Sequence, residues 1–264
     1  MMNSSDKTPD KHTSDPYADL TKPSNKPATD PIPAATVVLL RDSDAGIETL
    51  MLRKNKDIHF GDMWVFPGGR IDPDDYPASG DKTEAARYAA ARETHEEAGI
   101  HTTPEDFVWF SRWTPPPVTP KRFSTWFFAA RVPEHKKVII DGGEIHDHQW
   151  IKPQDALARH RERTFNFVPP TWVTLYYLAK HASVDEVLNV FASRSPTIYE
   201  THLGETEDGE RVAIWHGDAG YEAWDATVKG DRHRLTMAKN GFIFENSFED
   251  TMEMLPDFAL QTHG

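Results

Sequence analysis

The chain has 264 residues, and its 38% hydrophobic and 11% aromatic content can build the core of one large domain or two small ones. It contains no cysteine, which excludes disulfides, thiolate metal sites and a cysteine nucleophile, so catalysis has to use oxygen and nitrogen groups. The 29 Lys and Arg against 42 Asp and Glu give a formal net charge of −13, which argues against nucleic acid as a partner.

Residues 1–33 are predicted to form a disordered tail. They carry six prolines and almost no large aliphatic side chain, so they cannot bury enough surface to offset the entropy of ordering. The sequence has no run near the roughly 20 apolar residues that cross a bilayer, and no secretory or transit signal. We therefore expect a cytoplasmic protein with no membrane partner.

The folded part is expected to begin with a β-hairpin. The β-branched run at 35–40 faces a second strand pattern at 48–53 across a turn that contains glycine. A short aromatic strand is predicted at 64–66, and Pro67-Gly68-Gly69 is expected to break it.

The clearest helix is predicted at 82–98. It follows Asp81, an N-cap residue type, with Glu84 three positions later in a capping-box pattern, and it ends at Gly99. Three strands and three helices are expected after it: strands at 107–113, 125–132 and 148–151, and helices at 153–161, 169–181 and 183–194.

The segment beyond residue 196 is predicted to consist of hairpins. Residues 198–203 are expected to pair with 211–215, and 234–237 with 242–245 around Asn240-Gly241. We divide the chain into the tail, a catalytic domain at 34–182, and a helix and hairpin extension at 183–264 packed on that domain. The extension can cap a substrate pocket, form a homodimer interface or extend the core.

A cluster of acidic side chains on the 82–98 helix is the main chemical signal. At about 100° per residue, Glu93, Glu96 and Glu97 share one helix face, with Arg92 beside them. Carboxylates this close repel one another, and a hard cation such as Mg²⁺ or Mn²⁺ offsets the repulsion. The alternative is a solvated acidic face. We call Glu93, Glu96 and Glu97 the carboxylate cluster.

The wider pattern around this cluster closely resembles the Nudix box, the signature of Nudix hydrolases. Residues 92–100 supply Arg-Glu, Glu-Glu, Gly and an aliphatic residue at the family spacing, and Glu84 stands at its family distance before Arg92. Two departures are visible. Thr94 replaces a bulky aliphatic residue, and 14 residues separate Gly69 from Glu84 where the family has five.

The resemblance implies an α/β protein of the α+β type, with a mixed sheet sandwiched between helices. It also implies pyrophosphate hydrolysis, in which a metal-activated water attacks phosphorus. In the family pattern Glu93, Glu96 and Glu97 hold Mg²⁺ or Mn²⁺, the carbonyl of Gly68 is a further ligand, and Arg92 orients the carboxylates.

A further base or ligand is expected from outside the box. Glu144, which precedes the strand at 148–151, is either that catalytic group or an acid that keeps a loop soluble. An anionic substrate also needs fixed cations, and the candidates are Arg53, Lys54, Arg70, Arg112, Lys121 and Arg122. Of the whole region we assign Arg53, Arg70, Arg122 and Phe123 to substrate binding. The loop that leads to Arg122 combines charge with aromatic residues, which suits either phosphate and base recognition or a rigid turn.

The preferred substrate is coenzyme A or acyl-coenzyme A. Four features resemble the long-loop coenzyme A diphosphatase-like branch: the long insertion after 64–72, Thr114-Pro115 followed by Lys121-Arg122-Phe123, residues 125–128, and His216-Gly217-Asp218 with Tyr221. The alternatives are ADP-ribose or another nucleotide sugar, and a Nudix-like sensing module without turnover.

Overall fold

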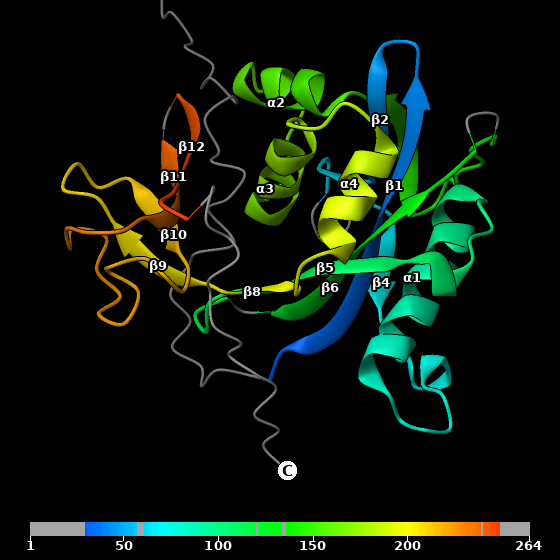
Figure 1. Ribbon diagram of the computed structural model, residues 1–264, viewed down its shortest axis with the longest axis horizontal. Coiled ribbons are helices and arrows are strands. Elements are labelled where there is room, and N and C mark those ends of the chain that lie inside the picture. Colours follow the sequence, from blue (N-terminus) through cyan, green and yellow to red (C-terminus); the bar gives the residue numbers. More distant parts are fainter. Residues whose placement is uncertain (1–29, 57–60, 120, 134–135, 239, 249–264) are drawn as a thin grey trace, which may run out of the picture.

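The computed structural model describes residues 30–56, 61–119, 121–133, 136–238 and 240–248. A mixed sheet of eight strands forms its centre, and a smaller antiparallel sheet of four strands stands beside it (Figure 1). The strands of the central sheet are β1 (Ile32–Ser43), β2 (Gly46–Lys54), β3 (Trp64–Val65), β4 (Gly68–Arg70), β5 (Val108–Thr114), β6 (Phe123–Arg131), β7 (Ile145–Ile151) and β8 (Thr197–Glu200). The small sheet contains β9 (His202–Glu205), β10 (Arg211–Ile214), β11 (His233–Ala238) and β12 (Gly241–Asn246).

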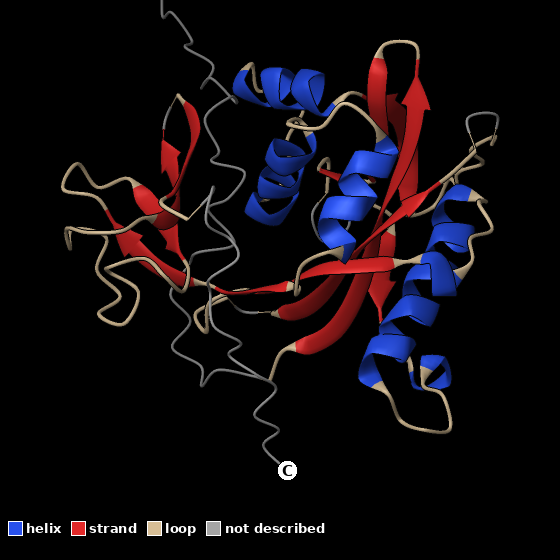
Figure 2. Ribbon diagram, viewed as in Figure 1, coloured by secondary structure: helices blue, strands red, loops and turns tan. Residues whose placement is uncertain are grey.

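The central sheet has the order β3-β2-β1-β6-β5-β8, with β4 added beside β1 and β7 beside β2. The pairs β1–β6 and β5–β8 are parallel, and the other pairs are antiparallel. Helices lie on both sides of this sheet (Figure 2). They are α1 (Lys82–Ala98), α2 (Pro153–Arg161), α3 (Pro169–Leu178) and α4 (Val184–Ala192), with short 3-10 helices η2 (Pro73–Asp75) and η3 (Pro104–Asp106).

Strand β1 is buried on both faces, which explains its nearly unbroken apolar sequence. Val37 and Leu39 pack with the alanine face of α1, in a cluster we call the α1 face of the sheet. Val38 and Leu40 point the other way and pack with residues of α2, α3 and α4, on the face we call the α2–α4 face. The mixed sheet between helices agrees with the predicted fold class.

The structure confirms most predicted elements and changes two boundaries near the start. The 35–40 and 48–53 strands form the predicted antiparallel hairpin. However, β1 begins at Ile32, so the last two residues assigned to the tail belong to the sheet, and residues 1–29 lie outside the described residues. Strand β3 ends before Pro67, as expected. The sequence predicted only a break there, but Gly68–Arg70 forms a further strand, β4, which pairs with β1.

The prediction of a hairpin between 198–203 and 211–215 was only partly right. The chain leaves one sheet and enters the other at Thr201, so β8 pairs in parallel with β5 and only β9 pairs with β10. The Thr201 N–H donates to the carbonyl of Thr114, 3.0 Å away, which fixes the crossing point. Local pattern cannot show that one extended run serves two sheets. The second predicted hairpin, β11 with β12, is present.

A buried ion pair holds the small sheet together. The Arg234 guanidinium contacts both carboxylate oxygens of Asp218 at 2.5 and 2.6 Å, and the His233 N–H also donates to this carboxylate. Hydrogen bonds from these groups keep the pKa of Asp218 below its ordinary value, although burial acts in the opposite direction. In the described part of the chain, no helix is long and apolar enough to cross a membrane.

Candidate active site

Helix α1 has the ends that its sequence predicts. The Asp81 carboxylate accepts a hydrogen bond from the Glu84 N–H at 2.8 Å, and Gly99 adopts the left-handed conformation, with φ 67°, that closes the helix. Thr94, the departure from the family pattern, is fully buried, and its hydroxyl donates to the Ala90 carbonyl at 2.7 Å. The hydroxyl therefore has a partner inside the helix, and the helix keeps its position against the sheet.

Two glycines let this helix lie very close to β4. A Cβ on Gly69 would lie 2.3 Å from a carboxylate oxygen of Glu93, and a Cβ on Gly68 would lie 2.3 Å from the Ala35 carbonyl oxygen. A larger residue at position 69 would push the Glu93 carboxylate away from the sheet, and one at position 68 would push β4 away from β1. The main chain of β4 and the side chains of α1 thus form one compact site.

Glu97 is the most deeply buried member of the carboxylate cluster, with 4% of its surface exposed. One oxygen accepts a hydrogen bond from the Gly68 N–H at 2.9 Å. The other, Oε1, is buried without a hydrogen-bond partner among the described residues, and the Lys54 ammonium lies 3.8 Å from it. Burial raises the pKa of Glu97 to about 8, against the opposing effects of Lys54 and the Gly68 N–H.

Arg92 is held by Asp75, a residue that sequence reasoning missed. Asp75 is buried, and its two oxygens accept from Nε and Nη2 of Arg92 at 3.0 and 2.9 Å. Arg92 also donates to the Arg70 carbonyl, at 3.0 Å. These bonds hold the pKa of Asp75 below its ordinary value, although burial acts in the opposite direction. The pair fixes the guanidinium in a bidentate geometry.

Asp75 comes from the long insertion after β4, to which the sequence analysis assigned no site residue. The Asp72 N–H donates to the Asp75 carboxylate at 2.8 Å, and Pro73 begins the short helix η2 between them. This Asp-Pro-x-Asp pattern is a local capping signal that sequence reasoning could have found. The insertion therefore supplies a residue to the site.

Arg92 in turn binds the other two members of the carboxylate cluster. Its Nη1 lies 3.0 Å from Glu93 and 3.2 Å from Glu96, and the pKa of Glu93 is raised by burial despite this pairing. Arg92 thus contacts Glu93 and Glu96, while the Gly68 N–H binds Glu97. Among the described residues, no three Asp, Glu or His side chains lie close enough together to form a metal site.

The carboxylate oxygens of this cluster are nevertheless ligands that suit a hard divalent cation. Among the described residues, no group donates a hydrogen bond to the buried Oε1 of Glu97, and the carboxylates of Glu93 and Glu96 stand on the same face of α1. Nudix hydrolases generally use divalent metals. The carbonyl of Gly68 as a ligand stays a prediction, since the contact described for Gly68 is the donation by its N–H to Glu97.

Glu144 lies close to this cluster in space, although it is distant in sequence. Its carboxylate contacts the Lys54 ammonium, which also faces Glu97. Its carbonyl accepts from the Asn55 N–H at 2.8 Å, which fixes the backbone just before β7. Its side chain is half exposed. Lys54 thus links Glu144 to Glu97, and the role of Glu144 as a base or ligand remains a prediction.

The four predicted substrate-binding residues are placed in three separate parts of the site region. Arg53 on β2 pairs with Asp62 at 3.4 Å. Arg70 is exposed at the end of β4, where its carbonyl holds Arg92. Arg122 and Phe123 lie together at the start of β6. The Nε of Arg122 donates to the Pro115 carbonyl at 3.1 Å. Lys121 lies over the Phe123 ring at 5.2 Å.

Arg122 lines a cavity of about 360 Å³ together with Arg112, another of the cations that the sequence offered as a candidate. The Arg112 guanidinium lies 5.3 Å from the centre of the Trp126 ring, and its buried Nε has no hydrogen-bond partner among the described residues. Lys82 and one carboxylate, Glu200, also line this cavity. We call it the Arg112 cavity. Its two guanidinium groups make it suitable for an anion.

Strand register relates the Arg112 cavity to the carboxylate cluster. A row of paired residues crosses four strands in the order Gly69, Ala35, Trp126 and Arg112. Paired residues point to the same side of a sheet, so this row lies on the α1 face, where Glu93 also lies. Three strand spacings make the separation between Gly69 and Arg112 roughly 14 Å.

The comparisons with known proteins agree with this geometry. The family profile of the NUDIX domain matches residues 30–171, more than half of the chain. A NUDIX hydrolase from Alicyclobacillus acidocaldarius is similar in fold, with 24% identity, a TM-score of 0.55, and coverage of 61% of this chain and 96% of that chain.

Other solved structures are similar at lower scores. A MutT protein from Methanosarcina mazei Go1 is 20% identical over 60% of this chain and 96% of that chain, with a TM-score of 0.42. A C. elegans Ap4A hydrolase binary complex is 25% identical over 56% of this chain and 99% of that chain, with a TM-score of 0.37. None of the curated proteins matches the sequence. With the box residues assembled at β4 and the profile match across them, the chain belongs to the Nudix hydrolase family, which acts on pyrophosphate bonds of nucleoside diphosphate derivatives.

Proposed function

We propose that the protein hydrolyses coenzyme A or acyl-coenzyme A at the pyrophosphate bond, with Mg²⁺ or Mn²⁺ as cofactor. The observation that carries the hydrolytic assignment is the buried Oε1 of Glu97 beside the Gly68-Gly69 main chain. No described residue donates a hydrogen bond to this oxygen, and the Lys54 ammonium lies 3.8 Å from it. A buried carboxylate oxygen without a donor is costly unless a cation or proton meets it. A divalent cation bound there neutralises phosphate charge and lowers the pKa of water.

The residues of this chain divide the remaining work among binding, orientation and proton handling. The carboxylate cluster would hold the cation, and Arg92, fixed by Asp75, positions Glu93 and Glu96 through its contacts with their carboxylates. Lys54 offsets negative charge between Glu97 and Glu144. Glu144 is the candidate to accept a proton from the attacking water, because its carboxylate is half exposed and close to the cluster.

The choice of coenzyme A rests on the sequence resemblance and is supported by the Arg112 cavity. Coenzyme A carries a 3′-phosphate in addition to its diphosphate, so its recognition needs cations away from the metal. Arg112 and Arg122 supply such cations on the α1 face, beside the Trp126 ring. ADP-ribose lacks this extra phosphate and would leave the cavity without a matching charge.

The test is a substrate panel with Mg²⁺ that includes coenzyme A, acetyl-coenzyme A and ADP-ribose, with product identification by chromatography. Formation of 3′,5′-ADP and a phosphopantetheine product supports the proposal. AMP with ribose 5-phosphate, and no coenzyme A cleavage, would assign the alternative substrate class. Arg112→Gln should raise KM for coenzyme A about tenfold and leave KM for ADP-ribose unchanged, since one charge-assisted bond is lost.

A second set of variants tests the metal site itself. Glu97→Gln keeps the shape of the side chain and removes its charge, so we expect at least about 100-fold lower activity on every substrate. Glu105→Gln, an exposed acid in η3, is the matched control and should retain wild-type activity. If Glu97→Gln keeps full activity, or if no substrate shows metal-dependent turnover, the assignment of this site to hydrolysis is wrong.

A further inference from the structure

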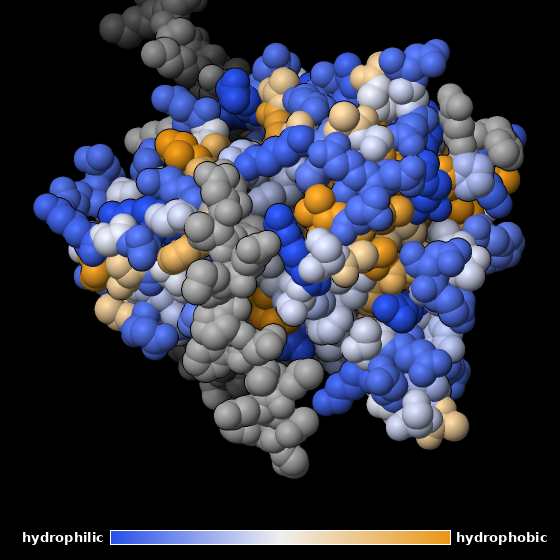
Figure 3. Space-filling model, viewed as in Figure 1, coloured by the Kyte–Doolittle hydropathy of each residue, from blue (hydrophilic) through white to orange (hydrophobic). Residues whose placement is uncertain are grey.

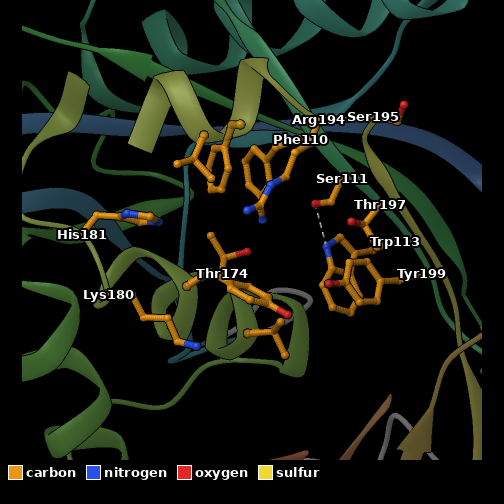
Figure 4. A pocket seen from close by; sticks show the side chains of 14 residues that line it. Phe110, Ser111, Trp113, Thr174, Lys180, His181, Arg194, Ser195, Thr197 and Tyr199 are labelled. Atoms are coloured by element: carbon orange, nitrogen blue, oxygen red, sulfur yellow. Dashed lines mark hydrogen bonds between the residues drawn. The ribbon is translucent and has the colours of Figure 1, made fainter. Parts of the chain in front are cut away.

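A second cavity, of about 230 Å³, lies between α3, α4 and the edge of the central sheet (Figure 4). Two pairs of stacked rings form its walls. Phe110 stacks on Phe191 with centroids 4.3 Å apart, and Trp113 stacks on Tyr199 at 3.6 Å. We call it the Arg194 cavity, after the side chain that extends into it. Phe110 and Phe191 are partly exposed, whereas Trp113 and Tyr199 are buried, and these flat walls suit a planar ring.

The Arg194 cavity lies on the α2–α4 face of the sheet, away from the carboxylate cluster. Trp113 and Tyr199 belong to the core cluster of this face. The register of β5 shifts between Trp109 and Ser111, and Phe110 lies at this shift. Its ring points to the α2–α4 face and packs against Phe127. No residue of the carboxylate cluster lines the cavity.

Most of the Arg194 cavity is built from the part of the chain that follows the family match. The NUDIX profile ends at residue 171, and only Phe110, Ser111 and Trp113 among the lining residues come before that point. The other walls come from α3, α4, β8 and the short segments that join them, which include Lys180 and Arg194. The cavity is therefore a feature of this chain's extension and of its contact with the family domain.

The charge of the Arg194 cavity is opposite to that of the protein. Among the residues that the structure describes, its lining includes Arg194 and Lys180 and no acidic residue, whereas the whole chain has a net charge of −13. Figure 4 shows the Arg194 side chain reaching into the cavity, with Thr174 and Lys180 across from it. On the face in Figure 3, apolar side chains gather around α4 and hydrophilic surface surrounds them. Positive charge beside apolar walls attracts anions and desolvates them in part.

We propose that the Arg194 cavity is a second ligand site, which binds a planar aromatic ring carrying one phosphate or carboxylate group. The ring would lie against the stacked aromatic walls, and the anion would meet the Arg194 guanidinium, a donor suited to bidentate contact. The volume fits one ring system with one anionic group rather than a whole dinucleotide. This proposal does not depend on hydrolysis at the carboxylate cluster.

The test is calorimetric titration of the full chain with AMP as the probe, in EDTA so that no divalent cation is bound. We expect saturable binding of one AMP per chain, with adenosine alone and inorganic phosphate alone each at least about tenfold weaker. Arg194→Ala should weaken AMP binding at least about tenfold. Arg161→Ala, an exposed arginine at the end of α2, is the matched control and should bind like wild type.

Two further variants, Lys180→Gln and Glu97→Gln, test the second cation of the cavity and its independence from the metal site. If Arg194→Ala does not fold, Lys180→Gln replaces it with the same expected direction, because Lys180 is exposed at the rim. Glu97→Gln should bind AMP in EDTA with wild-type affinity, which separates this cavity from the metal site. Absence of saturable binding up to about 1 mM AMP overturns the proposal. The proposal is also overturned if Arg194→Ala and Lys180→Gln both fold and bind AMP with wild-type affinity. Loss of AMP binding in Glu97→Gln overturns it as well.

Discussion

An ordinary carboxylate with a lowered pKa in the folded state stabilises a protein more as pH rises. Glu97 should have the opposite effect, so that the metal-free protein becomes less stable as pH rises. Its pKa in the folded protein is raised to about 8 from an ordinary value of 4.5, because burial disfavours the charge. Between these two pH values the folded state holds a proton that the unfolded state has lost. The stabilising contribution is therefore complete below pH 4.5 and is lost as pH rises toward 8.

The size of this effect follows from proton linkage. One proton gives a slope of about 1.4 kcal/mol per pH unit in the free energy of unfolding, so the interval from 4.5 to about 8 sets an upper limit near 5 kcal/mol. Relaxation of the site and approach of the Lys54 ammonium reduce the value. Histidines also titrate near this range, but wild type and Glu97→Gln share them, so the difference in stability between the two proteins from pH 6.5 to 8 isolates Glu97.

Urea denaturation in EDTA at several pH values measures this slope. We expect the stability of Glu97→Gln relative to wild type to increase by about 1–2 kcal/mol between pH 6.5 and 8, because the amide does not titrate. Addition of Mg²⁺ to wild type at pH 7 should release close to one proton, since the metal binds the carboxylate form. Parallel stability curves for wild type and Glu97→Gln across this window would refute the reasoning.

Two other substitutions test long-range contacts. Asp75→Asn should lower kcat about 10–100-fold with little change in KM, since it loosens Arg92 without touching substrate, and Asp74→Asn, its exposed neighbour, should be unaffected in a steady-state assay. Equal kcat for the two variants would show that Asp75 has no positioning role. Asp218→Ala should cost about 3–5 kcal/mol in denaturation experiments because it leaves the Arg234 charge buried, and Asp218→Leu with Arg234→Met should recover much of that loss. A loss below about 1 kcal/mol would contradict this account.

Much of the fold was accessible from local sequence pattern. The helix that carries the carboxylate cluster begins after Asp81 and ends at Gly99 as predicted, because capping and helix termination depend on residues only a few positions apart. The hairpin of β1 and β2 was found for the same reason. The path of β8 was missed, since an extended segment carries no local signal for the sheet that it joins.

The candidate site shows the same contrast between features set by local sequence and features set by tertiary contacts. The sequence by itself determined which carboxylates share a helix face, since this follows from fixed helical spacing, and the family resemblance implied that Gly68 lies beside them. Only the tertiary structure decided that Asp75 fixes Arg92, that Lys54 links Glu97 to Glu144, and that α3, α4 and β8 enclose a cationic aromatic cavity. These contacts join residues distant along the chain, and packing, which local pattern does not encode, brings them within bonding distance.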